Sequence, residues 1–177
     1  QMALEQGKAF THTILNSLIA HIAVLDGQGV IQMVNEPWQR FARDNAKPQC
    51  DAANNTSVGT NYLDIRQKAI GKHDDAQSAT LALQGIKSVM DGALPRFSME
   101  YPCHSPTQQR WFHLNVTPLA SGDQGVLVSH TNITDRKLSE LQALRSEQLL
   151  RTAIDTIDEA FVLYGPDDRL VLCNEKY

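Results

Sequence analysis

The side chains best suited to chemistry are one cysteine and three histidines in the second half of the chain. Cys103 and His104 are adjacent, and His113 and His130 follow them. Cysteine and histidine are the usual ligands of zinc. Adjacent residues on a strand point to opposite faces, however, so Cys103 and His104 would not share one metal ion. We therefore expect these residues to serve structure or turn formation rather than to bind zinc.

Catalytic motifs are absent from the sequence. It contains no G-x-S-x-G, no H-E-x-x-H and no phosphate-binding loop, so no nucleophile is paired with a base. Asp74 and Asp75 lie in a polar stretch and are interpreted as a solvated pair. We expect no enzymatic activity from these residues.

Composition argues against several other classes of protein. The 177 residues carry a formal net charge of -4 and no basic stripe, which argues against a nucleic-acid partner. The longest apolar run, Leu18 to Leu25, is interrupted by His21 and is far shorter than the roughly 20 residues that span a bilayer. Without a secretory leader, we expect a cytoplasmic fragment that makes no membrane contact. The cysteines are odd in number, lack CxxC spacing and are expected to be reduced thiols: Cys50, Cys103 and Cys173.

The elements that would position these side chains follow from hydrophobic spacing. Helical spacing recurs in four stretches, residues 4–18, 36–45, 61–70 and 78–90. Apolar runs and alternation predict five strands, at 21–25, 30–34, 96–103, 110–119 and from Gly125 onward. Two strands, several helices and three strands predict an α+β domain, with one five-stranded antiparallel sheet and short helices on one face.

Two local signals set the ends of helices. Asn35 directly follows the first hairpin and is a good N-cap for the helix over 36–45. Ser78 is expected to cap the helix over 78–90, and Asp91-Gly92 to end it.

The last strand runs into a charged helix with almost no loop between them. A strand anchored in a sheet and continued by a helix ties the helix mechanically to the sheet, which is a sensor's geometry. Arg145 and Gln148 interrupt the helix's apolar stripe, so pairing of two such helices would need adjoining domains to hold it. We expect a homodimer through this helix and the N-terminal one, and the alternative is a helix packed on its own domain. The stripe consists of Leu138, Leu141, Leu144 and Leu149.

An internal repeat connects the two ends of the chain. Residues 14–35 align without gaps on residues 153–174, so that Asn35 matches Asn174, 139 residues later. Trp38 then matches Tyr177, the last residue. The repeat predicts a second copy of the same module that begins near residue 153.

These features together resemble the PAS family of sensory and dimerisation domains. The resemblance rests on the hairpin ending in Val34-Asn35, on the helical middle, and on the segments RWFHLNVTPL and SHTNITDRK. The second segment is similar to the family's Asp-Ile-Thr junction, although Asn132 replaces the leading Asp and would weaken a charge-assisted contact. The junction implied by the resemblance is Asn132, Ile133, Thr134, Asp135 and Arg136.

The resemblance implies a tandem PAS region of a bacterial signalling protein. Its parts would be a flanking helix (1–18), a PAS domain (19–137), a helical signalling linker (138–152) and the truncated start of a second PAS domain (153–177). The module would bind a small molecule or dimerise, and would relay the result to an output domain of the same chain. A histidine kinase is the first expectation for that output, and a diguanylate cyclase or phosphodiesterase the second. The alternative is a ligand-free dimerisation scaffold.

The resemblance also suggests where a ligand would lie. The expected pocket residues are His21, Trp38, Tyr62, Phe97, Phe112, Leu114 and His130. For the two histidines, hydrogen bonding within a mixed core is an equal alternative, and Trp38 is a packing residue on the simplest interpretation. The identity of a ligand or cofactor stays open. We expect no photosensory flavin, because NYLDIRQKAI lacks the reactive cysteine, and no haem, because the helix over 78–90 has no histidine and His73 precedes it.

Overall fold

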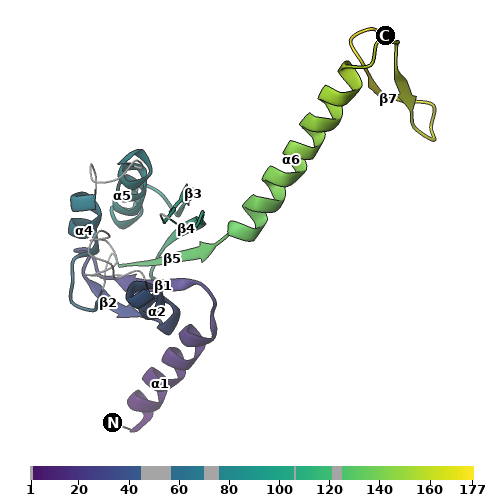
Figure 1. Ribbon diagram of the computed structural model, residues 1–177. Coiled ribbons are helices and arrows are strands. Elements are labelled where there is room, and N and C mark those ends of the chain that lie inside the picture. The colour runs from purple at the N-terminus through teal and green to yellow at the C-terminus, as the bar shows by residue number, and fades with distance from the viewer. Residues whose placement is uncertain (1, 45–56, 70–75, 106, 121–124) are drawn as a thin grey trace. The chain divides into compact units, whose positions relative to one another are not determined.

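The computed structural model describes residues 2–44, 57–69, 76–105, 107–120 and 125–177 (Figure 1). The chain divides into two compact units, Gln1–Ile133 and Thr134–Tyr177. Four residues considered in the sequence analysis lie outside the described residues: Cys50, His73, Asp74 and Asp75.

The first unit contains a five-stranded antiparallel sheet, which confirms the predicted α+β fold. Its strands are β1 (His21–Leu25), β2 (Ile31–Val34), β3 (Phe97–Pro102), β4 (Trp111–Pro118) and β5 (Val126–Asn132). They lie in the order β2-β1-β5-β4-β3, so the last strand in sequence is the central one. Whatever alters β1 or β4 therefore acts directly on β5.

The helices of the first unit are α1 (Met2–Ser17), α2 (Glu36–Asp44), α4 (Tyr62–Ala69) and α5 (Ala76–Met90). Helices α2, α4 and α5 place side chains on the buried face of the sheet, whereas α1 contacts α2. The alternation predicted for β4 is present, because Phe112, Leu114 and Val116 are all buried. Together with side chains from β1, β2 and β5, Leu114 and Val116 form a core cluster to which α2, α4 and α5 contribute Trp38, Tyr62, Ala82, Ile86, Val89 and Met90. Burial of such apolar surface is the main stabilising contribution to the fold.

One predicted helix start is wrong. Helix α5 begins at Ala76, so Ser78 lies inside the first turn and not at the N-cap. The predicted stop is correct: Gly92 has φ of 73° and accepts the left-handed conformation in which helices commonly end.

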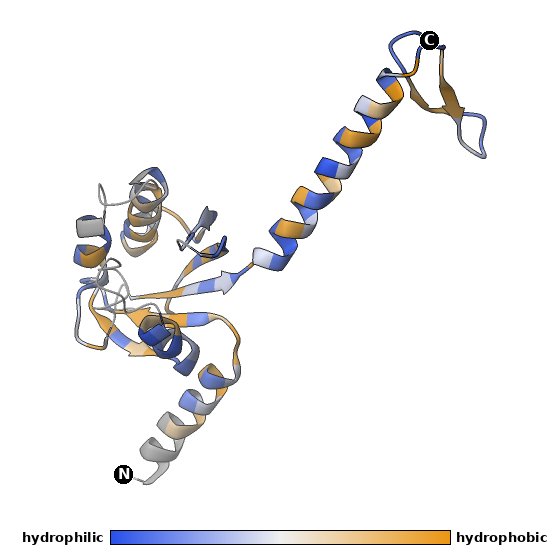
Figure 2. Cartoon of the chain, viewed as in Figure 1, coloured by the Kyte–Doolittle hydropathy of each residue, from blue (hydrophilic) through white to orange (hydrophobic). Residues whose placement is uncertain are grey.

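The second unit consists of a long helix and a short hairpin. Helix α6 spans Thr134–Asp155, which is longer at both ends than the predicted linker, and the hairpin is formed by β6 (Val162–Tyr164) and β7 (Leu170–Cys173). Apolar and polar residues alternate around α6 (Figure 2). Its leucines at 138, 141, 144 and 149 are 45–62% exposed, as expected for an apolar stripe on the surface.

The hairpin of the second unit repeats the geometry of the first. The pair Ala23 and Val34 corresponds to Val162 and Cys173, and each hairpin has a register shift at the same step, between Val24/Leu25 and Leu163/Tyr164. The turns agree as well, because Gly29 and Asp168 occupy equivalent positions and both have positive φ, 82° and 55°.

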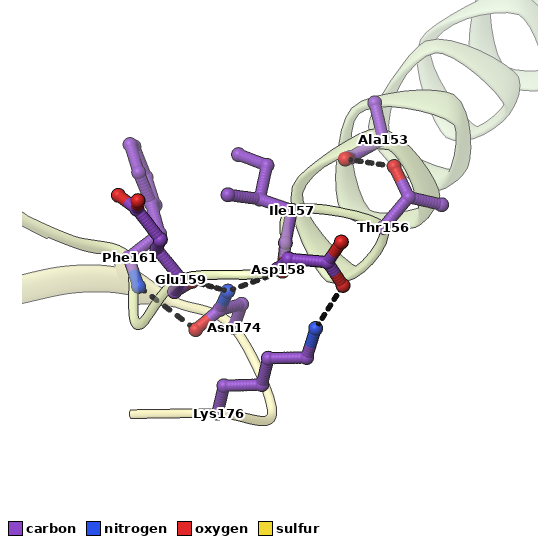
Figure 3. Close-up of polar contacts among 8 residues, drawn as sticks. All are labelled: Ala153, Thr156, Ile157, Asp158, Glu159, Phe161, Asn174 and Lys176. Carbon is purple, nitrogen blue, oxygen red and sulfur yellow. Dashed lines mark hydrogen bonds and ion pairs between the residues drawn. The ribbon is translucent and has the colours of Figure 1, made fainter.

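A buried asparagine anchors each hairpin in the same way. The Asn174 side-chain oxygen accepts from the Phe161 N–H at 2.9 Å, and its amide group donates to Glu159 O at 2.7 Å (Figure 3). The equivalent Asn35 accepts from the Ile22 N–H at 2.9 Å and donates to Ala20 O at 2.8 Å. The repeat seen in the sequence is therefore a repeat of hydrogen bonds as well as of residue types.

Candidate functional site

His130, on the central strand, is the centre of a buried polar cluster. In the sheet it lies beside His21 of β1 and Leu114 of β4, so three of the expected pocket residues are neighbours across the middle of the sheet. His130 is 5% exposed. A buried imidazole requires hydrogen-bond partners, and two tyrosines supply them.

Tyr62 reaches His130 from α4. Its hydroxyl lies 3.1 Å from His130 Nε2. Asn61 caps α4 by accepting from the Leu63 N–H at 2.9 Å, and the Tyr62 N–H donates to Gly29 O at 2.9 Å. A side chain at Gly29 would meet Leu63, which adds to the need for glycine at this positive φ. The first hairpin and the cap of α4 thus fix the position of the Tyr62 ring.

Tyr101 and Arg66 complete the cluster. The Tyr101 hydroxyl, from β3, lies 2.8 Å from His130 Nδ1. Arg66, one turn after Tyr62 on α4, donates from Nε at 2.9 Å and from Nη2 at 2.6 Å to the Tyr62 hydroxyl oxygen. The Arg66 guanidinium carbon also lies 5.1 Å from the centre of the Tyr62 ring.

These contacts assign the proton positions in the cluster. The Tyr62 oxygen accepts twice from Arg66, so its O–H donates to His130 Nε2. His130 Nδ1 then carries the ring proton and donates to Tyr101. Burial, and after it the positive charge of Arg66 and of His21, holds the pKa of His130 well below its usual value. His130 is therefore neutral at pH 7. Burial also raises the pKa of Tyr101.

Aromatic rings surround the polar cluster. The Trp38 ring centre lies 5.8 Å from that of Tyr62 and 5.6 Å from that of His130. The ring centre of Phe112 lies 5.7 Å from that of His21 and 6.1 Å from that of Tyr101, on which it stacks. The rings fill space with one another, so packing and hydrogen bonding operate in the same cluster.

The histidine next to Cys103 has a structural role. His104 Nδ1 accepts from the Arg110 N–H at 3.1 Å, and its ring meets Trp111 edge-on at 4.9 Å. Within the described part of the chain, no group of three or more His, Cys, Asp or Glu side chains could hold a metal ion.

The expected junction lies where β5 becomes α6. The Ile133 N–H donates a hydrogen bond of 2.9 Å to Trp111 O of β4, directly before the helix begins at Thr134. In the first turns of α6, Arg136 and Lys137 both contact Glu140, at 2.7 and 3.2 Å. Asn132 therefore ends the strand, Ile133 alone connects it to the helix, and the other three junction residues lie in the first turn of α6.

Comparison with known proteins gives relatives in sequence and in structure. No protein-family model matches the chain. The chain is 44% identical over 124 residues to the uncharacterized 104.1 kDa protein in hypE 3'region of Rhodobacter capsulatus, a match covering 68% of this chain and 12% of that protein. It is 32% identical over 60 residues to the non-motile and phage-resistance protein of Caulobacter vibrioides, covering 34% of this chain and 7% of that one. The chain thus spans a small part of each relative.

Among solved structures, the PAS domain of Bordetella pertussis BvgS superposes with a TM-score of 0.50 at 15% identity, covering 80% of this chain and 98% of that one. The chain has the PAS fold. The antiparallel sheet and the order of its elements are those that the resemblance implied.

Within this PAS fold, five expected pocket residues join one cluster through ring contacts or hydrogen bonds: His21, Trp38, Tyr62, Phe112 and His130. Leu114 is their neighbour in the sheet. Phe97 contacts α5 at Gly85, where an added Cβ would lie 2.3 Å from the Phe97 ring. Sequence reasoning missed Tyr101 and Arg66. The alternation of Tyr101 with Phe97 and Met99 could have indicated Tyr101, whereas Arg66 had no comparable signal.

Proposed function

We propose that this chain is the sensory part of a bacterial signalling protein. The PAS-fold unit, residues 19–137, would respond to a small molecule and pass the response through α6 to an output domain of the same chain. The observation that carries this proposal is the path from His130 to α6. His130 lies on the central strand, and that strand continues through Asn132 and Ile133 into the helix. A change at His130 therefore has a short covalent route to α6.

We also propose that residues 153–177 begin a second PAS domain, linked to the first by residues 138–152. Supporting this, Tyr164 and Leu170 are 50% and 51% exposed, whereas their counterparts Leu25 and Ile31 in the first hairpin are fully buried. Further elements would cover these side chains in a complete second domain. In a chain extended past Tyr177, hydrogen exchange at β6 and β7 should slow markedly. Unchanged exchange would count against a second domain.

The output domain, dimerisation and location follow the family resemblance. A histidine kinase is the first candidate for the output and a cyclic-di-GMP enzyme, a diguanylate cyclase or phosphodiesterase, the second. The protein would act in the cytoplasm as a homodimer held through α1 and α6. The exposed Phe10 and Ile14 of α1 and the exposed leucines of α6 offer apolar contact surface. None of the helices that the structure describes has the length and apolar content needed to cross a bilayer.

A helix-register experiment tests the relay. Deleting Gln142-Ala143 turns the start of α6 by roughly 200° relative to its end. Deleting seven residues, 142–148, shortens the helix more but changes its phase by only roughly 20°. In the longer protein, output activity in cells should change with the two-residue deletion and stay near the parent value with the seven-residue deletion. If both deletions give the same activity, α6 does not relay by helical phase.

The second candidate function is a ligand-free dimerisation scaffold. The observation that favours it is the mutual packing of the rings around His130, which fill the space that a ligand would use. Native mass spectrometry and absorption spectroscopy of the purified protein discriminate the two functions. A stoichiometric small molecule supports sensing, and a dimer without one supports a scaffold.

A further inference from the structure

Arg66 is a half-buried cation whose partners among the described residues are neutral. Its guanidinium donates twice to the Tyr62 hydroxyl, and the Tyr101 hydroxyl lies near it. Among the described residues, no carboxylate lies within ion-pair distance of Arg66. By contrast, Arg40, Arg136 and Arg169 form ion pairs on the surface, as in Arg40 with Glu36 at 2.8 Å. Partly burying a cation without an anion is unfavourable, so the site favours an added negative charge.

The numbers of hydrogen-bond donors and acceptors in the cluster also favour an added anion, which would act as an acceptor. A guanidinium has five N–H donors and no acceptor, whereas a tyrosine oxygen has two lone pairs and one O–H. The cluster of Arg66, Tyr62, His130 and Tyr101 therefore holds more donors than acceptors. His130 Nδ1 donates to the Tyr101 oxygen, which leaves the Tyr101 O–H and the Arg66 Nη1 group as donors to an added acceptor.

The charge and surroundings of these donors define the class of acceptor. Arg66 supplies one positive charge, and the neighbouring His130 is neutral, so the charge at the donors matches that of a monoanion. A carboxylate accepts two parallel N–H groups from a guanidinium with good geometry. Next to the donors, Tyr101 stacks on Phe112 and Phe41 lies edge-on to Phe112 at 5.4 Å, which favours an apolar body.

We propose that the PAS-fold unit binds a small apolar monocarboxylate, whose carboxylate is held by Arg66 and the Tyr101 hydroxyl. This inference rests on the proposed sensory function and names the ligand class for that site. Arg66 and Tyr101 are both half-buried, so the carboxylate approaches from their exposed side and leaves the Tyr62–His130 hydrogen bond in place.

The test uses three acids and their uncharged amides: benzoate, phenylacetate and hexanoate against benzamide, phenylacetamide and hexanamide. Binding is followed by calorimetry and by NMR of the His130 ring. At least one acid should bind saturably, with its amide at least about 10-fold weaker, because a hydrogen bond to a charged group is worth that much. Equal binding of acid and amide, or no binding by any acid, would overturn the proposal.

Variants assign the binding to the cluster. Arg66→Gln should weaken binding of the acid at least about 10-fold, and Arg66→Lys by less because the charge remains. Arg40→Gln, which removes an exposed arginine paired with Glu36, is the matched control and should leave binding unchanged. If Arg66→Gln does not fold, Tyr101→Phe replaces it, with an expected weakening of about 3-fold or more for one lost donor. Unchanged affinity in a folded variant at either position refutes the assignment.

The binding test and the test of the relay through α6 can fail independently of each other. If a carboxylate binds but the two α6 deletions give equal output, the ligand class holds and the relay does not. If the deletions differ but no acid binds, the relay holds and the ligand belongs to another class.

Discussion

The side-chain oxygen of Asn35 accepts a hydrogen bond of 2.9 Å from the N–H of Ile22, across the β1–β2 hairpin. The same oxygen caps α2 by accepting from the Trp38 N–H at 3.1 Å, and the amide group donates to Leu15 O and Ala20 O. One buried amide thus joins the end of α1, the start of β1 and the start of α2.

We predict that Asn35→Ala lowers the free energy of unfolding of the first unit by about 2–4 kcal/mol, because buried backbone groups lose their partner. Asn35→Asp should be similarly harmful, since a carboxylate cannot donate to the two carbonyls. Urea denaturation measures both effects. Asn16→Ala is the control: its oxygen accepts one exposed bond, from the Glu36 N–H, so a loss of about 1 kcal/mol or less is expected. Equal losses in Asn35→Ala and Asn16→Ala would contradict the anchoring role.

A second prediction concerns the loss of folding stability at acidic pH. The pKa of His130 is depressed in the folded protein, so the unfolded protein binds more protons below about pH 6.5. The contribution of the neutral His130 ring to stability should therefore be complete above this pH. The free energy of unfolding should fall by about 2 kcal/mol from pH 7 to pH 5. The lowered pKa of His21, also caused by burial, acts in the same direction.

Urea denaturation at several pH values measures this dependence. His130→Gln should be less stable at pH 7 but should lose much of the slope, because its side chain does not titrate. His12→Gln, at an exposed position on α1, should keep the slope. The carboxylate with a lowered pKa in the first unit, Asp26, affects stability only at pH values near and below its ordinary range, outside this window. A parent protein with flat stability between pH 7 and pH 5 would show that His130 is not buried as a neutral ring.

The third prediction uses the contact of α5 with β3. In a helix, replacing glycine by alanine normally stabilises by about 1 kcal/mol. At Gly85 the added Cβ would lie 2.3 Å from the Phe97 ring, so Gly85→Ala should instead destabilise by about 1–3 kcal/mol. At Gly7 of α1, nothing lies within 4 Å of the added Cβ, so Gly7→Ala should stabilise the protein by the usual amount of about 1 kcal/mol.

Thermal denaturation compares the two alanine variants. Combining Gly85→Ala with Phe97→Leu should cost less than the sum of the single changes, because the smaller side chain makes room. Strict additivity would mean that the ring does not cause the penalty.

The sequence predicts the fold well wherever the signal is local. The period of two along β4 and the first hairpin, with its strands at 21–25 and 30–34, are properties of neighbouring residues, and both predictions are confirmed. The N-cap role of Asn35 is local as well. Its bond to Leu15 O is not local, because 20 residues separate the two groups and only the folded chain brings them together.

The candidate site was predictable in part for the same reason. Alternation along β4 places Phe112 and Leu114 on one face of the sheet, whereas the other expected pocket residues follow from the family resemblance. Arg66 was missed because an exposed cation and a cation turned onto a tyrosine hydroxyl have the same local sequence. The hydrogen bonds of Arg66 depend on where α4 lies over β5, which no local pattern determines.

The last prediction addresses the junction and rests on the proposed relay. Ile133 is half-buried directly after β5, so Ile133→Ala keeps the backbone hydrogen bond to Trp111 O but removes side-chain packing, and it should loosen the connection while the His130 cluster stays intact. In the longer protein, Arg66→Gln should change output activity in the parent but not in the Ile133→Ala background. Binding of a carboxylate probe, measured by calorimetry on the same variants, should be nearly unaffected by Ile133→Ala alone. If Ile133→Ala weakens binding as strongly as it alters output, Ile133 is a core packing residue whose truncation leaves a cavity, and not a relay.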